Sequence, residues 1–410
     1  MEFETHRLDN GLSVVAECNG EAYSTALGFF VRAGSRDEDD AVAGVSHFLE
    51  HMTFKGTATR SADDVNREFD EIGAHYNAFT TEENTIYYAA VLPEYAGRAV
   101  ELLADILRPA LRESDFSTEK LVILEEIGMY EDQPPFGADE RIKALHYGPH
   151  PLGRSVLGTT ASITNLSAEA MRDYFRRRYS PENIVLVAAG QIDFSALVSW
   201  AERFCGEWAP LAAERLVRPA AALCGFEVIR KPSAAQEYVI QLADAPSAQD
   251  DDRYAARLLA TVLGDDSGSR LYWELLDSGL AEQVGLAHYE FDGAGAMMTF
   301  MSCDPAFAAD NLRRITEVYR TAEAGGITPE ELEQAKSKVR SRIVLSAERP
   351  RGRLFSVGAE WLYRHRYLPV REELDCLAAV TCDEVAAVLA KYPLTRATTI
   401  AVGPLDELTA

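Results

Sequence analysis

The chain has 410 residues, 47% of them apolar, and a formal net charge of −25. This length allows two or three domains with a core each, and the large apolar fraction excludes a disordered protein. The excess of carboxylates disfavours a polyanionic partner, because nucleic-acid binding depends on Lys and Arg side chains that neutralise phosphate. We therefore expect a folded protein with no nucleic-acid partner.

The opening segment, MEFETHRLDN, has neither the basic and apolar regions of a secretory signal nor the Arg-rich, acid-poor character of a transit peptide. No run approaches the roughly 18 consecutive apolar residues of a membrane span. The six cysteines are scattered without a C-x-x-C pair, which favours reduced thiols over disulfides or a thiolate metal site. These features predict a cytoplasmic protein with no membrane partner.

The run AGVSHFLEHMTFKGT carries H-x-x-E-H, the inverted zinc-protease signature, at His47, Glu50 and His51. If residues 43–54 form a helix, the spacing places both imidazoles and the carboxylate on one face. Neutral imidazoles suit zinc, and a carboxylate that does not bind the metal can act as general base toward a zinc-activated water. A chance match is the alternative. The apolar side of the same helix argues against chance and consists of Val45, Phe48, Leu49 and Met52.

The next run, GAHYNAFTTEENTIYYA, begins at a predicted turn and then alternates as an edge strand would. An extended peptide can add to such an edge through main-chain hydrogen bonds. For Asn77, turn chemistry and substrate contact are equally good interpretations. His75 lies close in sequence, but the motif already supplies two imidazoles.

A catalytic zinc ion normally takes three protein ligands, so a third donor is expected outside the motif. The pattern from Thr118 to Asp132 predicts an amphipathic helix that ends before two prolines. Glu119 and Glu126 lie two turns apart on one stripe, and Glu125 is rotated by about 100° onto the neighbouring stripe. We predict Glu126 as the ligand and Glu119 as a carboxylate that orients a ligand. Glu125 is the alternative ligand, and a solvated helix face is the alternative for Glu119.

The second half of the chain repeats the order of the first: a strand-like run, an acidic turn and a helix. The second half carries apolar residues around Leu258 to Leu263 where the first half has its motif, so only the first half can hold this metal site. Residues 209–222, rich in Pro and Ala, read as a linker between domains 1–208 and 223–410. Each half favours the α+β class, with an antiparallel sheet and helices packed on one side.

Three segments, HFLEHMTFKGT, GAHYNAFTTEENTIYYA and EKLVILEEIGMYED, resemble the pitrilysin or insulinase family of zinc peptidases. The closest resemblance is to its processing-peptidase branch, which includes mitochondrial processing peptidase and its bacterial homologues. The resemblance extends over most of the chain through THRLDNGLSVVAE, HPLGRSVLGT and SRLYWELLDSGLAEQV. It implies two homologous halves that face each other across a cavity, with one Zn²⁺ per chain. The implied zinc ligands are His47, His51 and Glu126, with Glu50 as general base and Glu119 in support of activity.

The resemblance also implies a substrate site. Asn77 and Ala78 would line the cleft, and Arg270 would help to position substrate, although an ion pair within its own domain explains Arg270 as well. Active relatives often use an Arg and a Tyr from the C-terminal half. Here Glu282 stands where many relatives have an aromatic residue, and AMMTFMSCDPAF contains no Arg. We therefore expect a homodimer, with a heterodimer with a related subunit as the alternative.

The predicted function is a zinc-dependent endopeptidase that hydrolyses peptides or unfolded segments bound as an extended strand in the enclosed cavity. The resembling processing peptidases favour Arg-containing presequences, and an acidic chamber would attract basic peptides. A surface that merely keeps the protein dissolved explains the negative charge equally well. Two other functions stay open: a non-catalytic scaffold or partner subunit of the same fold, and a metal hydrolase that acts on a non-peptide amide or ester.

Overall fold

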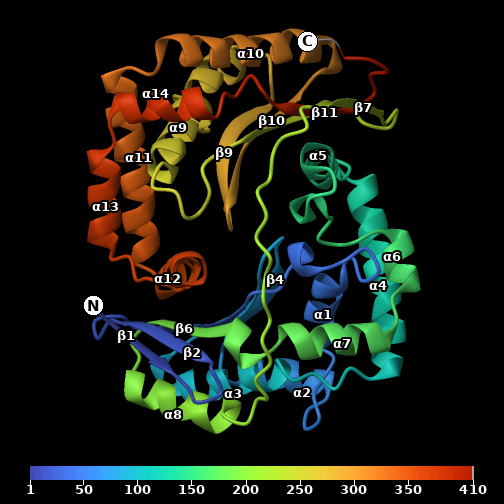
Figure 1. Ribbon diagram of the computed structural model, residues 1–410, viewed down its shortest axis with the longest axis vertical. Helices are drawn as coiled ribbons and strands as arrows, with labels where there is room; N and C mark the ends of the chain where they lie inside the picture. The colour runs from blue at the N-terminus through green and yellow to red at the C-terminus, as the bar shows by residue number, and fades with distance from the viewer. Residues whose placement is uncertain (409–410) are drawn as a thin grey trace. The chain divides into compact units, whose positions relative to one another are not determined.

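The computed structural model describes residues 1–408, which form two units that exchange segments of the chain (Figure 1). Unit 1 consists of Met1–Ile127, Arg154–Leu216 and Leu345–Leu368. Unit 2 consists of Gly128–Gly153, Val217–Val344 and the residues from Pro369 onward. Each unit therefore contains a piece from the other half of the chain. The division into 1–208, 209–222 and 223–410 stays a prediction; residues 209–222 contain no helix or strand.

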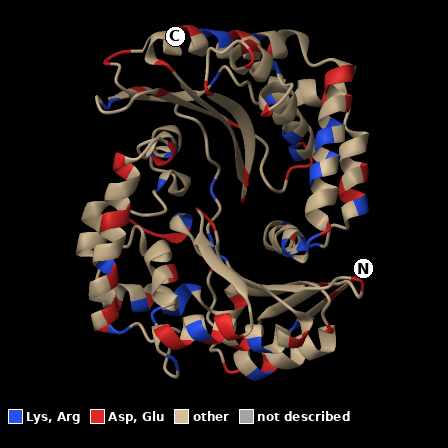
Figure 2. Cartoon of the chain, turned by 180° about the vertical axis from the view of Figure 1, so that it is seen from behind, with Lys and Arg blue, Asp and Glu red and all other residues tan. Residues whose placement is uncertain are grey.

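Unit 1 is built on a six-stranded sheet with the strand order β1-β2-β6-β3-β5-β4. The strands are β1 (Glu2–Arg7), β2 (Ser13–Cys18), β3 (Thr25–Val31), β4 (His75–Thr80), β5 (Thr85–Val91) and β6 (Ile184–Gly190). The pair β2 and β6 is parallel, and the other pairs are antiparallel. Every residue of β3 and β6 is buried, because these central strands are covered on both faces. Charged residues accordingly lie mainly on helices and loops (Figure 2).

Most helices of unit 1 come from the first half of the chain and share one large core with the sheet. They are α1 (Val45–Thr53), α2 (Ala62–Glu71), α3 (Ala96–Ile106), α6 (Thr160–Asn165), α7 (Ala168–Arg178) and α8 (Phe194–Cys205). The helix α4 (Glu113–Asp132) begins in unit 1 and ends in unit 2. The predicted helix from Thr118 to Asp132 is confirmed at its C-terminal end, but it begins five residues earlier, at Glu113.

The second face of this sheet is covered by α12 (Pro350–Arg364), which comes from the C-terminal half of the chain. Its apolar side packs onto side chains of β2, β3 and β6, in a cluster that includes Leu354, Val357, Val15, Phe30 and Val187. A Cβ atom at Gly358 would lie 2.3 Å from the Phe30 ring, so the helix can approach this closely only with glycine there. Arg353 of α12 binds the buried Glu17 carboxylate of β2 with contacts of 2.8 and 2.6 Å.

Unit 2 repeats this topology with a five-stranded sheet of order β7-β11-β8-β10-β9. The strands are β7 (Phe226–Arg230), β8 (Glu237–Asp244), β9 (Gln283–Phe291), β10 (Ala294–Cys303) and β11 (Thr398–Gly403). Mapping β2 to β6 onto β7 to β11 in chain order reproduces every pairing, including the single parallel pair. The helices that pack with this sheet are α5 (Ala138–Tyr147), α9 (Arg253–Gly264), α10 (Ala308–Gly325), α11 (Pro329–Ala347), α13 (Val370–Ala379) and α14 (Cys382–Lys391).

The predicted α+β class with two homologous halves is confirmed. The sheets differ from the expectation in two respects. Each sheet has one parallel pair and is therefore mixed, not purely antiparallel. Helices also cover both faces, because α12 and α5 each pack on the face opposite to the other helices of their unit. All six cysteines are free thiols. Within residues 1–408, no helix combines the length and apolar character that crossing a bilayer requires.

Candidate metal centre

The H-x-x-E-H residues lie on α1, whose N-terminal end is held by a buried carboxylate. Glu38, in the acidic turn before the helix, accepts hydrogen bonds from the backbone N–H groups of Gly44 and Ser46, each at 2.7 Å. These N–H groups have no partner within the helix, so the carboxylate satisfies them. Burial of Glu38 outweighs these donors and raises its pKa to about 7. Gly44 adopts φ 89°, a left-handed conformation that favours glycine.

The structure brings together the three residues predicted to bind the metal. One ligand atom each from His47, His51 and Glu126 lies within 4.8 Å of the others. The Oε2 atom of Glu126 is 3.8 Å from Nε2 of His47 and 3.6 Å from Nε2 of His51. Tetrahedral zinc, with bonds of about 2.1 Å, holds its ligand atoms roughly 3.4 Å apart. The two distances to Glu126 are close to this value, and the donor set of two imidazoles and one carboxylate is one that catalytic zinc takes, so the residues fit a zinc ion.

The charge states of the two imidazoles also fit a metal site. Burial, assisted by His51, lowers the pKa of His47 to about 3, so its ring is neutral, as a metal ligand must be. Burial opposes the charged form of His51 as well, but the hydrogen bond to Glu119 and the charges of Glu126 and Glu50 outweigh it and raise its pKa. A cation among these carboxylates would take the place of the proton on His51.

Glu119 is buried, at 3% exposure, and not on a solvated helix face. Nδ1 of His51 donates to Oε1 of Glu119 at 2.9 Å, which leaves Nε2 directed at Glu126. The second carboxylate oxygen accepts from Nζ of Lys55 at 2.7 Å. Burial favours the neutral acid, but these two donors outweigh it and hold the pKa of Glu119 below its usual value. Glu119 thus sets the ring orientation and the tautomer of His51.

Glu50, the predicted base, is held by a residue that sequence reasoning missed. Oγ1 of Thr80, at the end of β4, donates to Oε2 of Glu50 at 2.6 Å. Burial raises the pKa of Glu50, and the Thr80 hydrogen bond and the His51 charge only partly oppose this effect. No sequence signal points to Thr80, because the contact depends on how α1 packs against the sheet.

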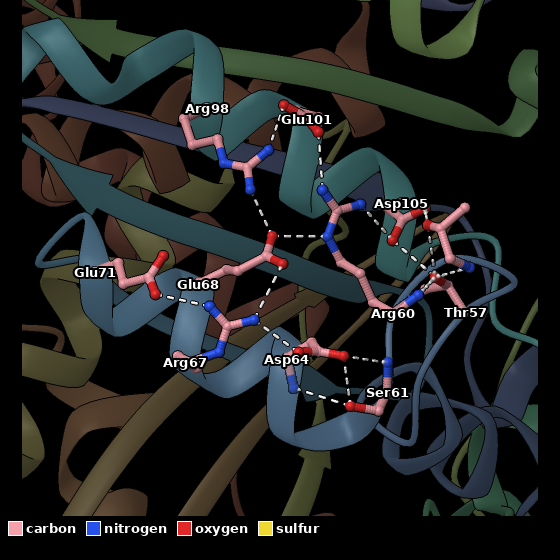
Figure 3. A network of polar contacts seen from close by, with 11 residues as sticks. Thr57, Arg60, Ser61, Asp64, Arg67, Glu68, Glu71, Arg98, Glu101 and Asp105 are labelled. Atoms are coloured by element: carbon pink, nitrogen blue, oxygen red, sulfur yellow. Dashed lines mark hydrogen bonds and ion pairs between the residues drawn. The ribbon is translucent and has the colours of Figure 1, made fainter.

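The segment that follows α1 is fixed by a network of charged side chains around Arg60 (Figure 3). The Arg60 guanidinium contacts carboxylates of Glu68 on α2 and of Glu101 and Asp105 on α3, each at 2.8 Å. Oγ1 of Thr57 donates to Asp105 at 2.8 Å. These contacts connect the C-terminal end of the motif helix to two neighbouring helices and restrain its position.

The remaining predicted residues lie outside this cluster. Glu125 is exposed, so the structure favours Glu126 over it as the third ligand. Asn77 and Ala78 lie in β4, an edge strand as predicted, and the Asn77 side chain accepts a hydrogen bond from the Ala78 N–H at 2.9 Å. In unit 2, Arg270 binds Glu331 through two contacts of 2.7 and 2.8 Å, which is the ion pair given as its alternative.

Comparison with known proteins agrees with this geometry. The family model described as insulinase (peptidase family M16) matches residues 13–160, and the one described as peptidase M16 inactive domain matches residues 165–339. A protein of Mycobacterium tuberculosis, named an uncharacterized zinc protease, is 35% identical over 402 residues, which cover 95% of this chain and 90% of the relative. The chain belongs to peptidase family M16. This M16 peptidase is also 33% identical over 379 residues to the zinc protease YmxG of Bacillus subtilis, with 92% of each chain covered.

Solved structures show the same fold. The crystal structure of a protease from Helicobacter pylori matches with a TM-score of 0.93 at 21% identity, over 98% of this chain and 99% of that one. A putative M16-like peptidase from Alicyclobacillus acidocaldarius matches with a TM-score of 0.86 at 23% identity, over 98% of each chain. The resemblance to the insulinase family of zinc peptidases is therefore confirmed, and the protein is a zinc metallopeptidase of the M16 family. Its place in the processing-peptidase branch stays a prediction. The inactive-domain match agrees with α9, which contains no His, Asp, Glu or Cys and stands where unit 1 has its motif helix.

Proposed function

We propose that this M16 peptidase is a zinc-dependent endopeptidase that hydrolyses peptides or unfolded segments. One observation carries the proposal: His47, His51 and Glu126 converge within 4.8 Å, and the non-ligating Glu50 lies on the same helix face. When bound there, zinc would supply Lewis acidity for the attack of water on a carbonyl group. An intact donor set of this kind argues against a non-catalytic scaffold or partner subunit.

Glu50 is the residue that moves the proton. Its carboxylate accepts a proton from the attacking water and later delivers it to the leaving amine. Burial raises the pKa of Glu50. A higher pKa strengthens the carboxylate as a base and brings its proton affinity closer to neutral pH, where a general base works best.

The edge strand β4 supplies the surface for an extended substrate. β4 pairs only with β5 in the sheet of unit 1, so one row of its main-chain groups can pair with a peptide. We propose that Asn77 and Ala78 contact substrate along this edge. Thr80 ends the same strand and bonds to Glu50, which supports a substrate path along β4 toward the base. The roles of Arg270 and Glu119 in activity remain proposals carried by the family resemblance.

The preferred substrate and the partners are inferred from charge and resemblance. The net charge of −25 supports basic peptides over acidic ones and argues against nucleic acid. We propose a homodimer in the cytoplasm, of the processing-peptidase branch, with a heterodimer with a related subunit as the alternative. Native mass spectrometry of the purified chain would distinguish the homodimer from a chain that needs a second subunit.

Two variants test the proposed function on a degenerate peptide mixture, with and without a chelator. Glu50→Gln should retain stoichiometric zinc and lose turnover, because the amide cannot accept a proton. His47→Ala should lose stoichiometric zinc as measured by elemental analysis. Turnover at the wild-type rate in Glu50→Gln would refute the base, and unchanged zinc in His47→Ala would refute the ligand set.

A further inference from the structure

Thr80 makes a contact to Glu50 whose direction can be assigned from its neighbours. Its Oγ1 lies 2.6 Å from Oε2 of Glu50 and 3.4 Å from Oγ1 of Thr85. The Thr85 hydroxyl donates its only proton to the backbone oxygen of Ala33 at 2.8 Å. Thr85 can therefore only accept in its long contact with Thr80, and an ionised carboxylate also only accepts. The single Thr80 proton goes to Glu50, because the distance of 2.6 Å is typical of a hydroxyl that donates to a carboxylate and 3.4 Å is long for a hydroxyl pair.

This hydrogen bond fixes one side of the Glu50 carboxylate. Among the described residues, no other donor is hydrogen-bonded to the Glu50 carboxylate oxygens. A partly buried carboxylate with one strong donor has one of its oxygens fixed and the other available. The Thr80 hydroxyl occupies Oε2, so Oε1 is the oxygen left to take a proton.

We propose that Thr80 is a positioning residue for the general base and holds Glu50 with Oε1 directed at the attacking water. This inference rests on the proposed function and extends it. Thr80 is also the last residue of β4, the edge strand along which we place the substrate. The backbone of Thr80 thus belongs to the strand that we propose to bind substrate, and its side chain binds the general base. One residue therefore aligns the peptide with the group that activates water.

Substitution of the hydroxyl tests this role. Thr80→Val keeps the branched shape and removes the donor, and Thr80→Ser keeps the donor and removes the methyl group. Hydrogen bonds to charged groups correspond to roughly 10- to 100-fold in an equilibrium or rate. We expect kcat of Thr80→Val to fall by about 10- to 100-fold. KM and the zinc content should stay within about twofold of the wild type, and Thr80→Ser should recover most of kcat.

A matched control separates the hydroxyl from the strand. Thr81→Val removes the neighbouring hydroxyl, which bonds to the turn at Asn84 and does not contact Glu50. It should keep the wild-type kcat, and an equal kcat loss there would overturn the proposal. The affinity for an uncleaved peptide is measured by calorimetry in the Glu50→Gln protein with and without Thr80→Val. It should be unchanged, and a loss of affinity would show that Thr80 supports only the strand.

The controls also distinguish failure of this inference from failure of the proposed function. If Glu50→Gln is inactive and Thr80→Val has the wild-type kcat, Glu50 remains the base and the role of Thr80 is refuted. If Glu50→Gln is fully active, the base assignment itself fails, and the role of Thr80 fails with it. Failure of Thr80→Ser to recover kcat would also count against the hydroxyl as the working group.

Discussion

Glu119 offers the most direct test of how this metal centre is supported. Its carboxylate accepts from Nδ1 of His51 at 2.9 Å and from Nζ of Lys55 at 2.7 Å, and its side chain is almost fully buried. Replacement by Gln keeps the shape and the single acceptor that His51 needs, but it removes the negative charge. The His51 ring then loses basicity toward a cation, and the Lys55 ammonium is left beside a neutral amide.

The expected result is weaker zinc binding with the fold intact. Removal of a carboxylate that orients a ligating histidine typically costs about 10- to 100-fold in metal affinity, or roughly 1.4 to 2.8 kcal/mol. Competition with a zinc-chelating dye would measure the change at constant pH. Glu125→Gln is the matched control, because this exposed neighbour on the same helix lies outside the cluster. Equal zinc affinity in Glu119→Gln and the wild type, or an equal loss in Glu125→Gln, would refute the reasoning.

Two further predictions concern the residues that hold α1 and α12 in place. The pKa of Glu38 rises on folding from 4.5 to about 7, so its contribution to stability is complete below pH 4.5 and is lost as the pH rises through 7. Glu38→Gln should remove this dependence, so the difference in urea midpoint between the wild type and the variant should change between pH 5.5 and pH 8. The same difference at both pH values would contradict the assignment. Arg353→Met leaves the Glu17 carboxylate, which is 2% exposed, without its cationic partner and with the Tyr367 hydroxyl as a remaining donor. It should lower the free energy of unfolding by about 3 kcal/mol. The double variant with Glu17→Gln should recover part of that loss, and a single variant as stable as the wild type would show that the ion pair contributes nothing.

Two features of unit 1 could not be predicted from the sequence: the contact that holds Glu50 and the helix that covers the second face of the sheet. Thr80 is 30 positions from Glu50 and belongs to a strand, so no helical spacing relates the two residues. Lys55 lies one turn after His51, yet its partner Glu119 lies on another helix. The segment of α12 could be expected to form a helix, but nothing in its pattern says that it covers a sheet from the other half of the chain.

The sequence by itself determined the chemistry of the centre, because helical spacing is a local property. The positions of His47, Glu50 and His51 within one helix, and of Glu119 and Glu126 on one stripe of another, already decide which side chains can share a face. Packing alone decided that the two helices bring these faces together, that Thr80 holds the base, and that segments are exchanged between the units. Such contacts join residues far apart in the chain, and they form where the burial of apolar surface is most favourable.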